Sequence, residues 1–290
     1  MGNTNHYFMI PFSVYNSGTP LLFLHANGYP PDCYHPLFDA LNGYQITAMH
    51  QRPLWENAQP KEIDDWHPLT DDLFRFMDEQ KLDGIPAVGH SLGGIVLLQA
   101  ALREPERFSH VILLDPVLFP PFFIRFTKIA RALNFLDKVH PLIPAAQHRR
   151  QIFKNREIIL RGYRKKKVFQ YFSDESLKAY IDGITCPQND KSYKLCYPAE
   201  WEVQIYRTGV WSDMEIWREL PKLKVSLLII RGAKTDTFWQ SAEKRVKKKL
   251  PSAKTISIPE STHLVPLEEP QAVRDEIIKF LKKNYETEYK

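Results

Sequence analysis

The chain has 290 residues, of which 43% are hydrophobic and 25% are charged, and its formal net charge is +5. Such a composition is ordinary for a globular protein, and the length suits one large α/β domain with an insertion. No apolar run approaches the roughly 20 residues of a membrane-spanning helix, and residues 1–6 lack the pattern of a signal peptide. Three cysteines are too few for a disulfide framework, so we expect a cytoplasmic protein; a bond between Cys186 and Cys196 stays open.

The first part of the chain alternates short apolar runs with helical patterns. Residues 8–15 are typical of an edge strand because Pro11 cannot donate to a sheet, and residues 21–24 form a continuous apolar run typical of a buried strand. Helical patterns cover 31–41 and 70–84, and a further short strand is predicted at 46–49. Strands alternating with helices in this way predict βαβ units and a mostly parallel sheet.

A glycine-flanked serine follows the next apolar run. Residues 85–88 lead into Gly89-His90-Ser91-Leu92-Gly93, and a helical pattern continues to Leu102. A serine on such a turn presents its hydroxyl above the sheet, and side chains in place of the two glycines would clash with the neighbouring strand or helix. The N-terminus of the helix directs N–H groups and a positive dipole end at the same point. Another buried strand, 111–114, then ends at Asp115.

The regular alternation stops for about a hundred residues after Asp115. Apolar residues recur there on one helical face, at Phe122, Phe126, Ile129, Leu133 and Leu136. Residues 122–170 also contain thirteen Lys or Arg against two acidic residues. This change of composition predicts a separate, mainly helical module. Because no nucleic-acid motif accompanies the charge, we expect a solvated helix face, and weak peripheral contact with an anionic membrane stays open as an alternative.

The sheet pattern resumes near the C-terminus. A buried strand at 225–230 is followed by Gly232 and Asp236, and the last strand, 254–258, is followed by His263. A final amphipathic helix is predicted from 270 to 283.

The serine motif between a strand and a helix, followed by Asp236 and by Thr-His-Leu-Val-Pro-Leu-Glu-Glu-Pro at 262–270, resembles the α/β-hydrolase family, specifically its serine-nucleophile members with a helical cap. The resemblance covers 20–116 and 222–283 well. It implies a mostly parallel open sheet flanked by helices, with the cap inserted after the sixth strand. The hydrolase core would then be 1–116 and 222–290, and the cap 117–221.

The resemblance also implies a set of site residues. Ser91 would be the nucleophile of the nucleophile elbow, His263 the general base and Asp236 the acid of a catalytic triad. Asp236 lies four residues after Gly232, where many members have three, and Asp115 is the alternative acid. The backbone N–H groups of Asn27 and Leu92 would form the oxyanion hole, although Ala26 stands where the family often has glycine.

These residues predict a serine hydrolase that cleaves a carboxylic ester-type bond of a small, largely apolar substrate through an acyl-enzyme, without cofactor or metal. A serine at position 91 argues against dehalogenase and epoxide hydrolase chemistry, which need a carboxylate nucleophile. Thioesterase, lactonase, lipid hydrolase and C–C bond hydrolase activities stay open because they share the same triad. A non-catalytic binding protein is the other alternative, and the retained triad and glycines argue against it.

Five further residues are candidates for the substrate pocket: His25, Phe119, Phe122, Phe123 and Trp201. For most of these aromatic side chains, we prefer packing of the cap on the core to a role in the pocket. For His25, we prefer a role in orienting its loop through backbone hydrogen bonds.

Overall fold

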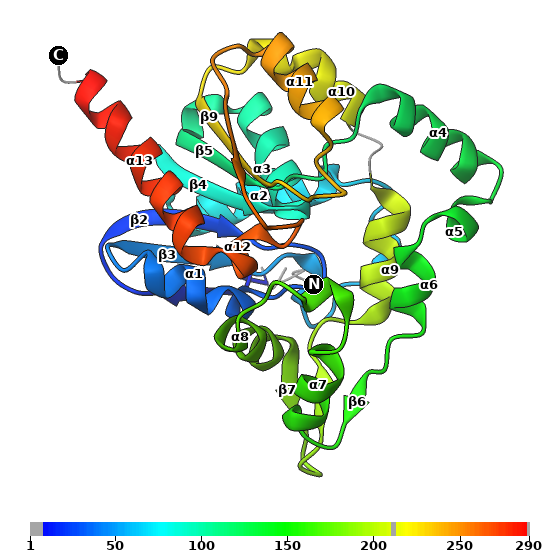
Figure 1. Ribbon diagram of the computed structural model, residues 1–290. Coiled ribbons are helices and arrows are strands. Elements are labelled where there is room, and N and C mark those ends of the chain that lie inside the picture. Colours follow the sequence, from blue (N-terminus) through cyan, green and yellow to red (C-terminus); the bar gives the residue numbers. More distant parts are fainter. Residues whose placement is uncertain (1–7, 210–212, 289–290) are drawn as a thin grey trace, which may run out of the picture.

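The computed structural model describes residues 8–209 and 213–288, so residues 1–6, on which the signal-peptide expectation rests, lie outside the described part (Figure 1). A seven-stranded sheet crosses the molecule in the order β1-β3-β2-β4-β5-β9-β10. Only β1 runs antiparallel to its neighbour, and the other neighbouring strands are parallel. The strands are β1 (Phe12–Tyr15), β2 (Thr19–Leu24), β3 (Tyr44–Met49), β4 (Ile85–His90), β5 (Phe108–Leu114), β9 (Ser226–Gly232) and β10 (Lys254–Ile258).

The four central strands are the continuous apolar runs of the sequence. Val88 of β4 pairs with Ile112 of β5, which pairs with Leu228 of β9, and all three side chains are buried. Strands buried on both faces need helices on both faces. Because β2, β4, β5 and β9 run parallel, their carboxyl ends meet at one edge of the sheet, where ligands bind in open α/β folds.

Helices cover the two faces of the sheet in two sets. One face packs against α2 (His67–Gln80), α3 (Leu92–Arg103), α10 (Asp213–Glu219) and α11 (Gln240–Lys249). The other packs against α1 (His35–Ala40), α12 (Val265–Glu268) and α13 (Pro270–Glu288). Helix α2 begins three residues earlier than predicted, with Pro68 in its first turn, where the missing N–H of proline costs nothing. Within the described residues, no helix combines the length and apolar character needed to cross a lipid bilayer.

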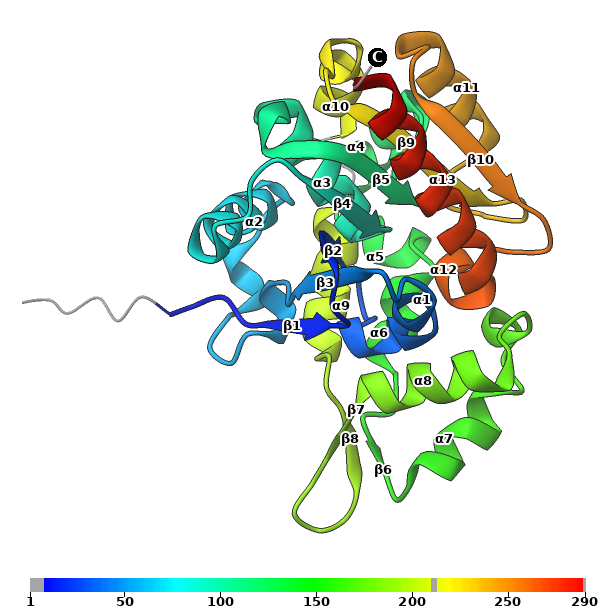
Figure 2. The same ribbon diagram turned by 90° about the vertical axis from the view of Figure 1, so that its left-hand side faces the viewer.

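The chain leaves the sheet after β5 and returns at β9, and we call residues 117–221 the inserted segment. β5 is the fifth strand along the described chain, so the expected insertion after a sixth strand is corrected to an insertion after the fifth. Figure 2 shows much of the segment beyond α1, at one end of the molecule. Besides α10, its helices are α4 (Pro121–Ala132), α5 (Leu136–Val139), α6 (Leu142–Gln147), α7 (Arg156–Tyr163), α8 (Asp174–Ile184) and α9 (Ala199–Thr208).

The inserted segment is mainly helical, as predicted, and it also contains a small antiparallel sheet that was not predicted. Its strands are β6 (Ile152–Phe153), β7 (Thr185–Pro187) and β8 (Tyr193–Leu195), in the order β6-β8-β7. These runs are two or three residues long, too short for a period of two to stand out in the sequence. Cys186 and Cys196 form a disulfide with Cα atoms 5.4 Å apart. Because disulfides are rare in a reducing cytoplasm, the cysteines no longer support the expectation of a cytoplasmic protein.

Short 3₁₀ turns join many of these elements: η1 (Pro31–Tyr34), η2 (Arg52–Leu54), η3 (Pro60–Glu62), η4 (Pro105–Arg107), η5 (Lys167–Phe169) and η6 (Leu220–Lys222).

Candidate active site

Ser91 stands alone between β4, which ends at His90, and α3, which begins at Leu92. Its backbone has φ 55° and ψ −113°, a conformation that non-glycine residues rarely adopt. The turn is held from both sides: the Ser91 N–H donates to the Leu114 carbonyl at 3.0 Å, and the Ser91 carbonyl accepts from the Ile95 N–H at 3.3 Å. The strained serine is therefore held in place by β5 and by its own helix.

The two glycines that flank the serine have the steric role predicted from the sequence. A Cβ on Gly89 would lie 2.4 Å from the Gly93 carbonyl oxygen, and a Cβ on Gly93 would lie 2.4 Å from the Leu24 carbonyl oxygen. Both obstacles are backbone atoms, which cannot move aside as a flexible side chain would. The close crossing of β4, α3 and β2 at this point therefore requires glycine at both positions.

His263, in the loop between β10 and α12, lies against the serine. Its Nε2 is 2.9 Å from Ser91 Oγ, and its Nδ1 is 2.9 Å from Oδ1 of Asp115. The His263 side chain is 23% exposed and the Asp115 side chain is fully buried. The three side chains form one continuous chain of hydrogen bonds, from a serine hydroxyl through an imidazole to a buried carboxylate.

Asp115 is held by two further donors. Its Oδ2 accepts the Gly232 N–H at 2.9 Å, and its Oδ1 accepts the Thr235 hydroxyl at 2.7 Å. A buried carboxylate needs such partners, because leaving it unpaired away from water is costly. The alternative acid of the sequence is thus the one that the structure places at His263.

The preferred acid, Asp236, does not hold His263, and this prediction is corrected. Asp236 is exposed; its Oδ1 lies 3.3 Å from the Thr237 hydroxyl, and its backbone carbonyl accepts the Trp239 indole N–H at 2.6 Å. The turn that begins at Gly232 packs so tightly on the histidine loop that a Cβ there would lie 2.1 Å from the Thr262 carbonyl oxygen. The residue next to Asp115 is therefore Thr235, whose hydroxyl donates to it. Asp236, one residue further along the chain, lines a cavity instead.

The expected oxyanion donors lie beside Ser91. Asn27 and Leu92 line the same cavity as the serine. Leu92 is the first residue of α3, where a backbone N–H has no partner within the helix. The Asn27 side chain is fixed by the inserted segment: its Oδ1 accepts the Tyr197 hydroxyl at 2.8 Å, and its Nδ2 donates to the Glu202 carbonyl at 3.2 Å.

His25 orients its loop, as we preferred, and its place among the pocket candidates is corrected. Its Nδ1 lies 2.8 Å from the Ala26 carbonyl, and its Nε2 accepts the Gln51 N–H at 3.1 Å. The side chain is fully buried, and burial lowers the pKa of His25 to about 3, so the imidazole is neutral. Both ring nitrogens are thereby used by the backbone.

A second histidine was missed as a functional candidate, although it lies within the motif. The Tyr34 hydroxyl accepts the Ala26 N–H at 3.1 Å and lies 2.7 Å from Nδ1 of His90, whose Nε2 lies 2.9 Å from the His263 carbonyl. Burial lowers the pKa of His90 well below its ordinary value, so its ring is neutral. With one ring proton, His90 donates through Nε2 and accepts the Tyr34 O–H at Nδ1. No sequence pattern distinguishes such a residue from an ordinary core histidine.

A cavity of about 370 Å³ reaches Ser91 from the inserted segment. Phe119 and Phe123 line it as predicted, whereas two other candidates do not and are corrected. Phe122 lies on the outer face of α4 and is 62% exposed. Trp201 packs within the apolar core and is 2% exposed. The other residues that line this cavity are Trp66, Val117, Phe126, Thr127, Leu136, Val139, His140, Pro141, Leu142, Ile205, Tyr206, Gly209, Thr237 and Trp239.

A second cavity, of about 570 Å³, is lined by the inserted segment and by Tyr29 of the core, and it shares Leu142 and Tyr206 with the first. Its wall contains three cations. Arg149 pairs with Glu202 at 3.0 Å, whereas Arg150 lies over the Phe153 ring and Lys166 over the Tyr163 ring. Burial, with the charge of Arg149 adding to it, lowers the pKa of Lys166.

Comparison with known proteins agrees with this architecture. Residues 21–276 match the model of the alpha/beta hydrolase family. The chain is 26% identical to an uncharacterised hydrolase of Bacillus subtilis (strain 168) over 244 residues, 82% of this chain and 81% of that one. It is 21% identical to an esterase of Escherichia coli (strain K12), over 84% of this chain and 85% of that one. The structure of E-2-(acetamidomethylene)succinate hydrolase superposes with a TM-score of 0.75 at 18% identity, covering 93% of this chain and 94% of that one. The chain therefore belongs to the alpha/beta hydrolase family.

Proposed function

We propose that the protein is a serine hydrolase that cleaves a carboxylic ester-type bond of a small, largely apolar substrate. The observation that carries the proposal is the chain of hydrogen bonds Ser91 Oγ to His263 Nε2 and His263 Nδ1 to Asp115, at the inner end of an apolar cavity. Because a serine hydroxyl is a poor nucleophile at neutral pH, it needs a base within hydrogen-bond distance, and His263 meets that requirement.

The mechanism follows from these contacts. Ser91 Oγ attacks the substrate carbonyl carbon while His263 Nε2 takes the hydroxyl proton, and Asp115 holds the Nδ1 proton and stabilises the imidazolium. The N–H groups of Asn27 and Leu92 bind the developing oxyanion, each contributing about 3–4 kcal/mol in the transition state. His263 then protonates the leaving alcohol. Water, activated by the same imidazole, attacks the acyl-enzyme and releases the acid and the free serine.

The inserted segment acts as a cap in this proposal. Phe119, Phe123 and Phe126 come from it and form an aromatic wall of the cavity. A volume of about 370 Å³ lies toward the small end of the range of ligand cavities and suits a short or medium acyl group.

The second cavity favours one alternative substrate class, a thioester whose leaving group carries negative charge. Arg150 and Lys166 line this cavity, and neither pairs with a carboxylate in the described part of the chain. A substrate that spans both cavities would place its acyl group against the aromatic wall and its anionic leaving group near these cations. The triad would be unchanged.

The test is labelling by a fluorophosphonate probe, combined with hydrolysis of p-nitrophenyl esters of increasing acyl length. Labelling should disappear in Ser91→Ala and persist in Ser252→Ala, an exposed serine far along the chain. An acyl-coenzyme A of the same acyl length separates the two substrate classes. If the wild type prefers the acyl-coenzyme A to the p-nitrophenyl ester and Lys166→Ala loses this preference, the thioester is favoured. A folded wild-type protein that neither labels nor turns over any of these substrates would refute the proposal in favour of a non-catalytic binding protein.

A further inference from the structure

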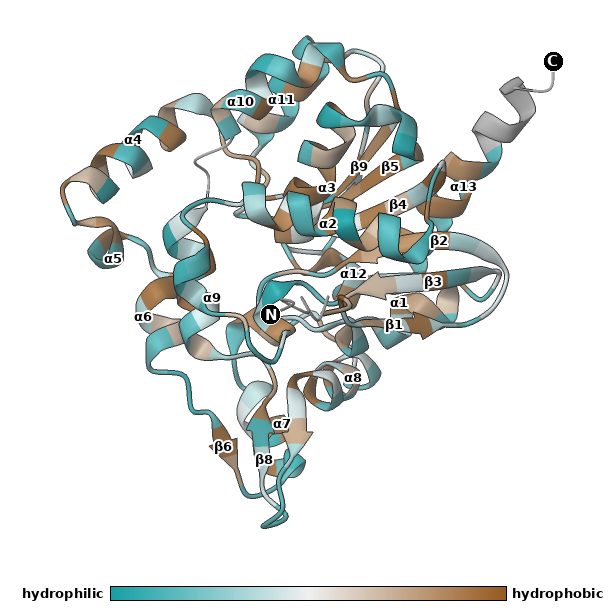
Figure 3. Ribbon diagram, turned by 180° about the vertical axis from the view of Figure 1, so that it is seen from behind, coloured by the Kyte–Doolittle hydropathy of each residue, from teal (hydrophilic) through white to brown (hydrophobic). Residues whose placement is uncertain are grey.

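Helix α4 turns an apolar face to solvent. Phe122, Phe126, Ile129 and Leu133, the stripe noted in the sequence, are 62%, 50%, 60% and 72% exposed. The helix is held by its other side, through Ile124, Thr127 and Ala130, which are buried. Apolar stripes ordinarily face the core, so an exposed one that continues over three turns calls for a partner. Figure 3 shows α4 at the outer edge of the molecule, with hydrophobic and hydrophilic positions alternating along its ribbon.

The exposed apolar surface continues past the end of α4. Phe135 and Leu142 are 45% and 48% exposed, so six of the twelve large exposed apolar residues in the described chain fall between 122 and 142. We call Phe122, Phe126, Ile129, Leu133, Phe135 and Leu142 the α4 patch. Its concentration in one short segment distinguishes it from the single exposed apolar residues that any protein surface carries.

Cations border the α4 patch. Arg125 and Lys128 are exposed on α4, and Lys138 is exposed just beyond the end of the helix. Helix α4 itself contains no Asp or Glu. Asp137 is engaged by Arg207, and Asp213, the acid that interacts with Lys128, is buried. A helix with aromatic and aliphatic residues on one face and Lys or Arg beside them has the form of helices that lie in a lipid–water interface.

The same helix also lines the cavity that reaches Ser91. Phe123 and Thr127 face the cavity from α4, and Phe126 belongs both to the cavity wall and to the α4 patch. Leu142 likewise lines the cavity and belongs to the patch. A surface that covers the α4 patch would therefore lie at the outer wall of the cavity.

We infer that the α4 patch inserts into an anionic lipid surface and brings the cavity above Ser91 to that interface. The charge argues for a lipid rather than a second copy of the chain. A two-fold contact between copies would place Arg125 and Lys128 of one against the same cations of the other, with no acid on α4 to compensate. Anionic headgroups instead supply the opposite charge beside an apolar layer. Hydrolysis of a substrate at the lipid surface rests on the proposed function, whereas binding of the α4 patch to lipid does not.

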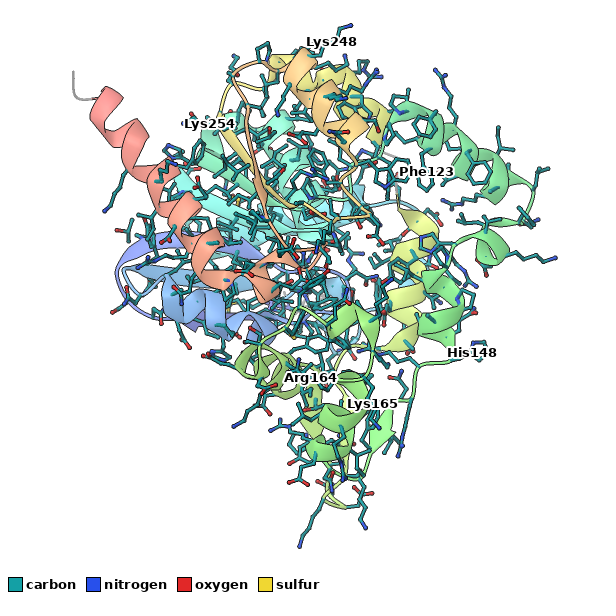
Figure 4. All side chains as sticks on the ribbon, in the orientation of Figure 1. Phe123, His148, Arg164, Lys165, Lys248 and Lys254 are labelled. Carbon is teal, nitrogen blue, oxygen red and sulfur yellow. A yellow bond between two sulfur atoms is a disulfide. The ribbon has the colours of Figure 1, made fainter. Side chains whose placement is uncertain are left out.

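The α4 patch is separate from the run of four consecutive cations at residues 164–167, which we call the basic run. Figure 4 shows Arg164 and Lys165 in the lower part of the inserted segment, near α7 and α8 and well apart from α4. Residues 164–167 therefore provide a matched control: Lys165→Glu with Lys167→Glu changes the net charge as much as Arg125→Glu with Lys128→Glu, at a different place.

The experiment is co-sedimentation of the full chain with phosphatidylcholine vesicles, with and without phosphatidylserine, at low and high salt. We expect binding only with phosphatidylserine, weakened by salt, and reduced about tenfold or more by Arg125→Glu with Lys128→Glu. The 165/167 control should bind as the wild type does. Ile129→Ser with Leu133→Ser should also lose binding, whereas Val14→Ser with Ile152→Ser, which removes apolar side chains that are more than half exposed elsewhere, should not.

Two outcomes would overturn the inference. One is equal loss of binding in the 165/167 control, which would assign the contact to the basic run. The other is a wild-type dimer in sedimentation that Ile129→Ser with Leu133→Ser converts to monomer, without vesicle binding by either. Ser91→Ala should bind vesicles as tightly as the wild type, so a failure of the proposed hydrolysis remains distinguishable from a failure of docking.

Discussion

The hydroxyl of Tyr34 lies 2.7 Å from Nδ1 of His90, and this pair connects two loops of the site. Through this pair the loop after β2, at Ala26, is joined to the loop that carries His263. Tyr34, His90 and Ala26 are buried, so the hydrogen bonds among them are made without competition from water.

Tyr34→Phe should leave the His90 Nδ1 and the Ala26 N–H without a partner. We expect a loss of about 1–2 kcal/mol in the free energy of unfolding and a fall on the order of tenfold in kcat for an ester substrate, because both the oxyanion loop and His263 lose support. Chemical denaturation and steady-state kinetics measure the two effects. Tyr15→Phe, which removes a hydroxyl bound to exposed Asp32, is the control; equal kcat loss in both variants would contradict a role for the pair in positioning.

The two acids that the sequence offered can be separated by mutation. Asp115→Asn should reduce kcat/KM by about 10³- to 10⁴-fold, since a neutral amide does not stabilise the imidazolium and its NH₂ group can donate to Nδ1 and favour the wrong tautomer. Asp236→Asn should stay near the wild-type value because Asp236 does not contact His263. A larger loss in Asp236→Asn than in Asp115→Asn would contradict the geometry. Circular dichroism on both proteins checks that each is folded.

Adjacent phenylalanines of α4 differ in what they face. Phe123 lines the cavity and Phe122 does not. Phe123→Ala should enlarge the cavity and move the preferred p-nitrophenyl ester to a longer acyl chain, whereas Phe122→Ala should leave the preference unchanged. The measurement is kcat/KM across the ester series in the absence of lipid. A shift in both variants, or in Phe122→Ala alone, would show that the cavity is not the acyl site.

Asp213 makes stability depend on pH. Burial raises the pKa of Asp213 to about 7, and its Oδ2 accepts the Phe119 N–H at 3.1 Å. The folded protein thus holds a proton that the unfolded chain releases near pH 4, so stability from this group is present at low pH and is lost as pH rises toward 7. Asp213→Asn should gain Tm relative to the wild type as pH rises from about 4 to 8.

The matched control for Asp213 is Asp137→Asn. Pairing with Arg207 lowers the pKa of Asp137, so its stabilisation is present at neutral pH and is lost as pH falls through the lowered pKa. The Tm difference between this variant and the wild type should therefore have the opposite sign of pH dependence. A pH-independent difference for Asp213→Asn would contradict the burial of a protonated carboxyl group.

The Cys186–Cys196 bond closes a short loop across the small sheet. In the chain-entropy account, such a loop contributes about 3 kcal/mol to stability by restricting the unfolded chain. We expect a reducing agent to lower the denaturation midpoint of the wild type and to leave Cys186→Ser with Cys196→Ser unchanged at the lower value. An identical midpoint for the wild type with and without reducing agent would show that the bond contributes nothing measurable.

The sequence by itself determined those parts of the protein that depend on neighbouring residues. The turn at Ser91 needs a strand, two glycines and a helix within consecutive residues, and all of these could be identified before any contact was known. The parallel sheet followed from the length and order of the apolar runs. His263 followed from a compact motif after the last strand.

Only the tertiary structure decided between Asp115 and Asp236, because both follow a strand and the choice depends on which carboxylate lies next to the imidazole. β5 lies between β4 and β9, so the loop after it is adjacent to Ser91, and Thr235 occupies the space that Asp236 would need. The same holds for α4. A period of 3.6 residues identifies its apolar face, but what covers that face is decided by packing against the rest of the chain, and here the other side of the helix is the one that is buried.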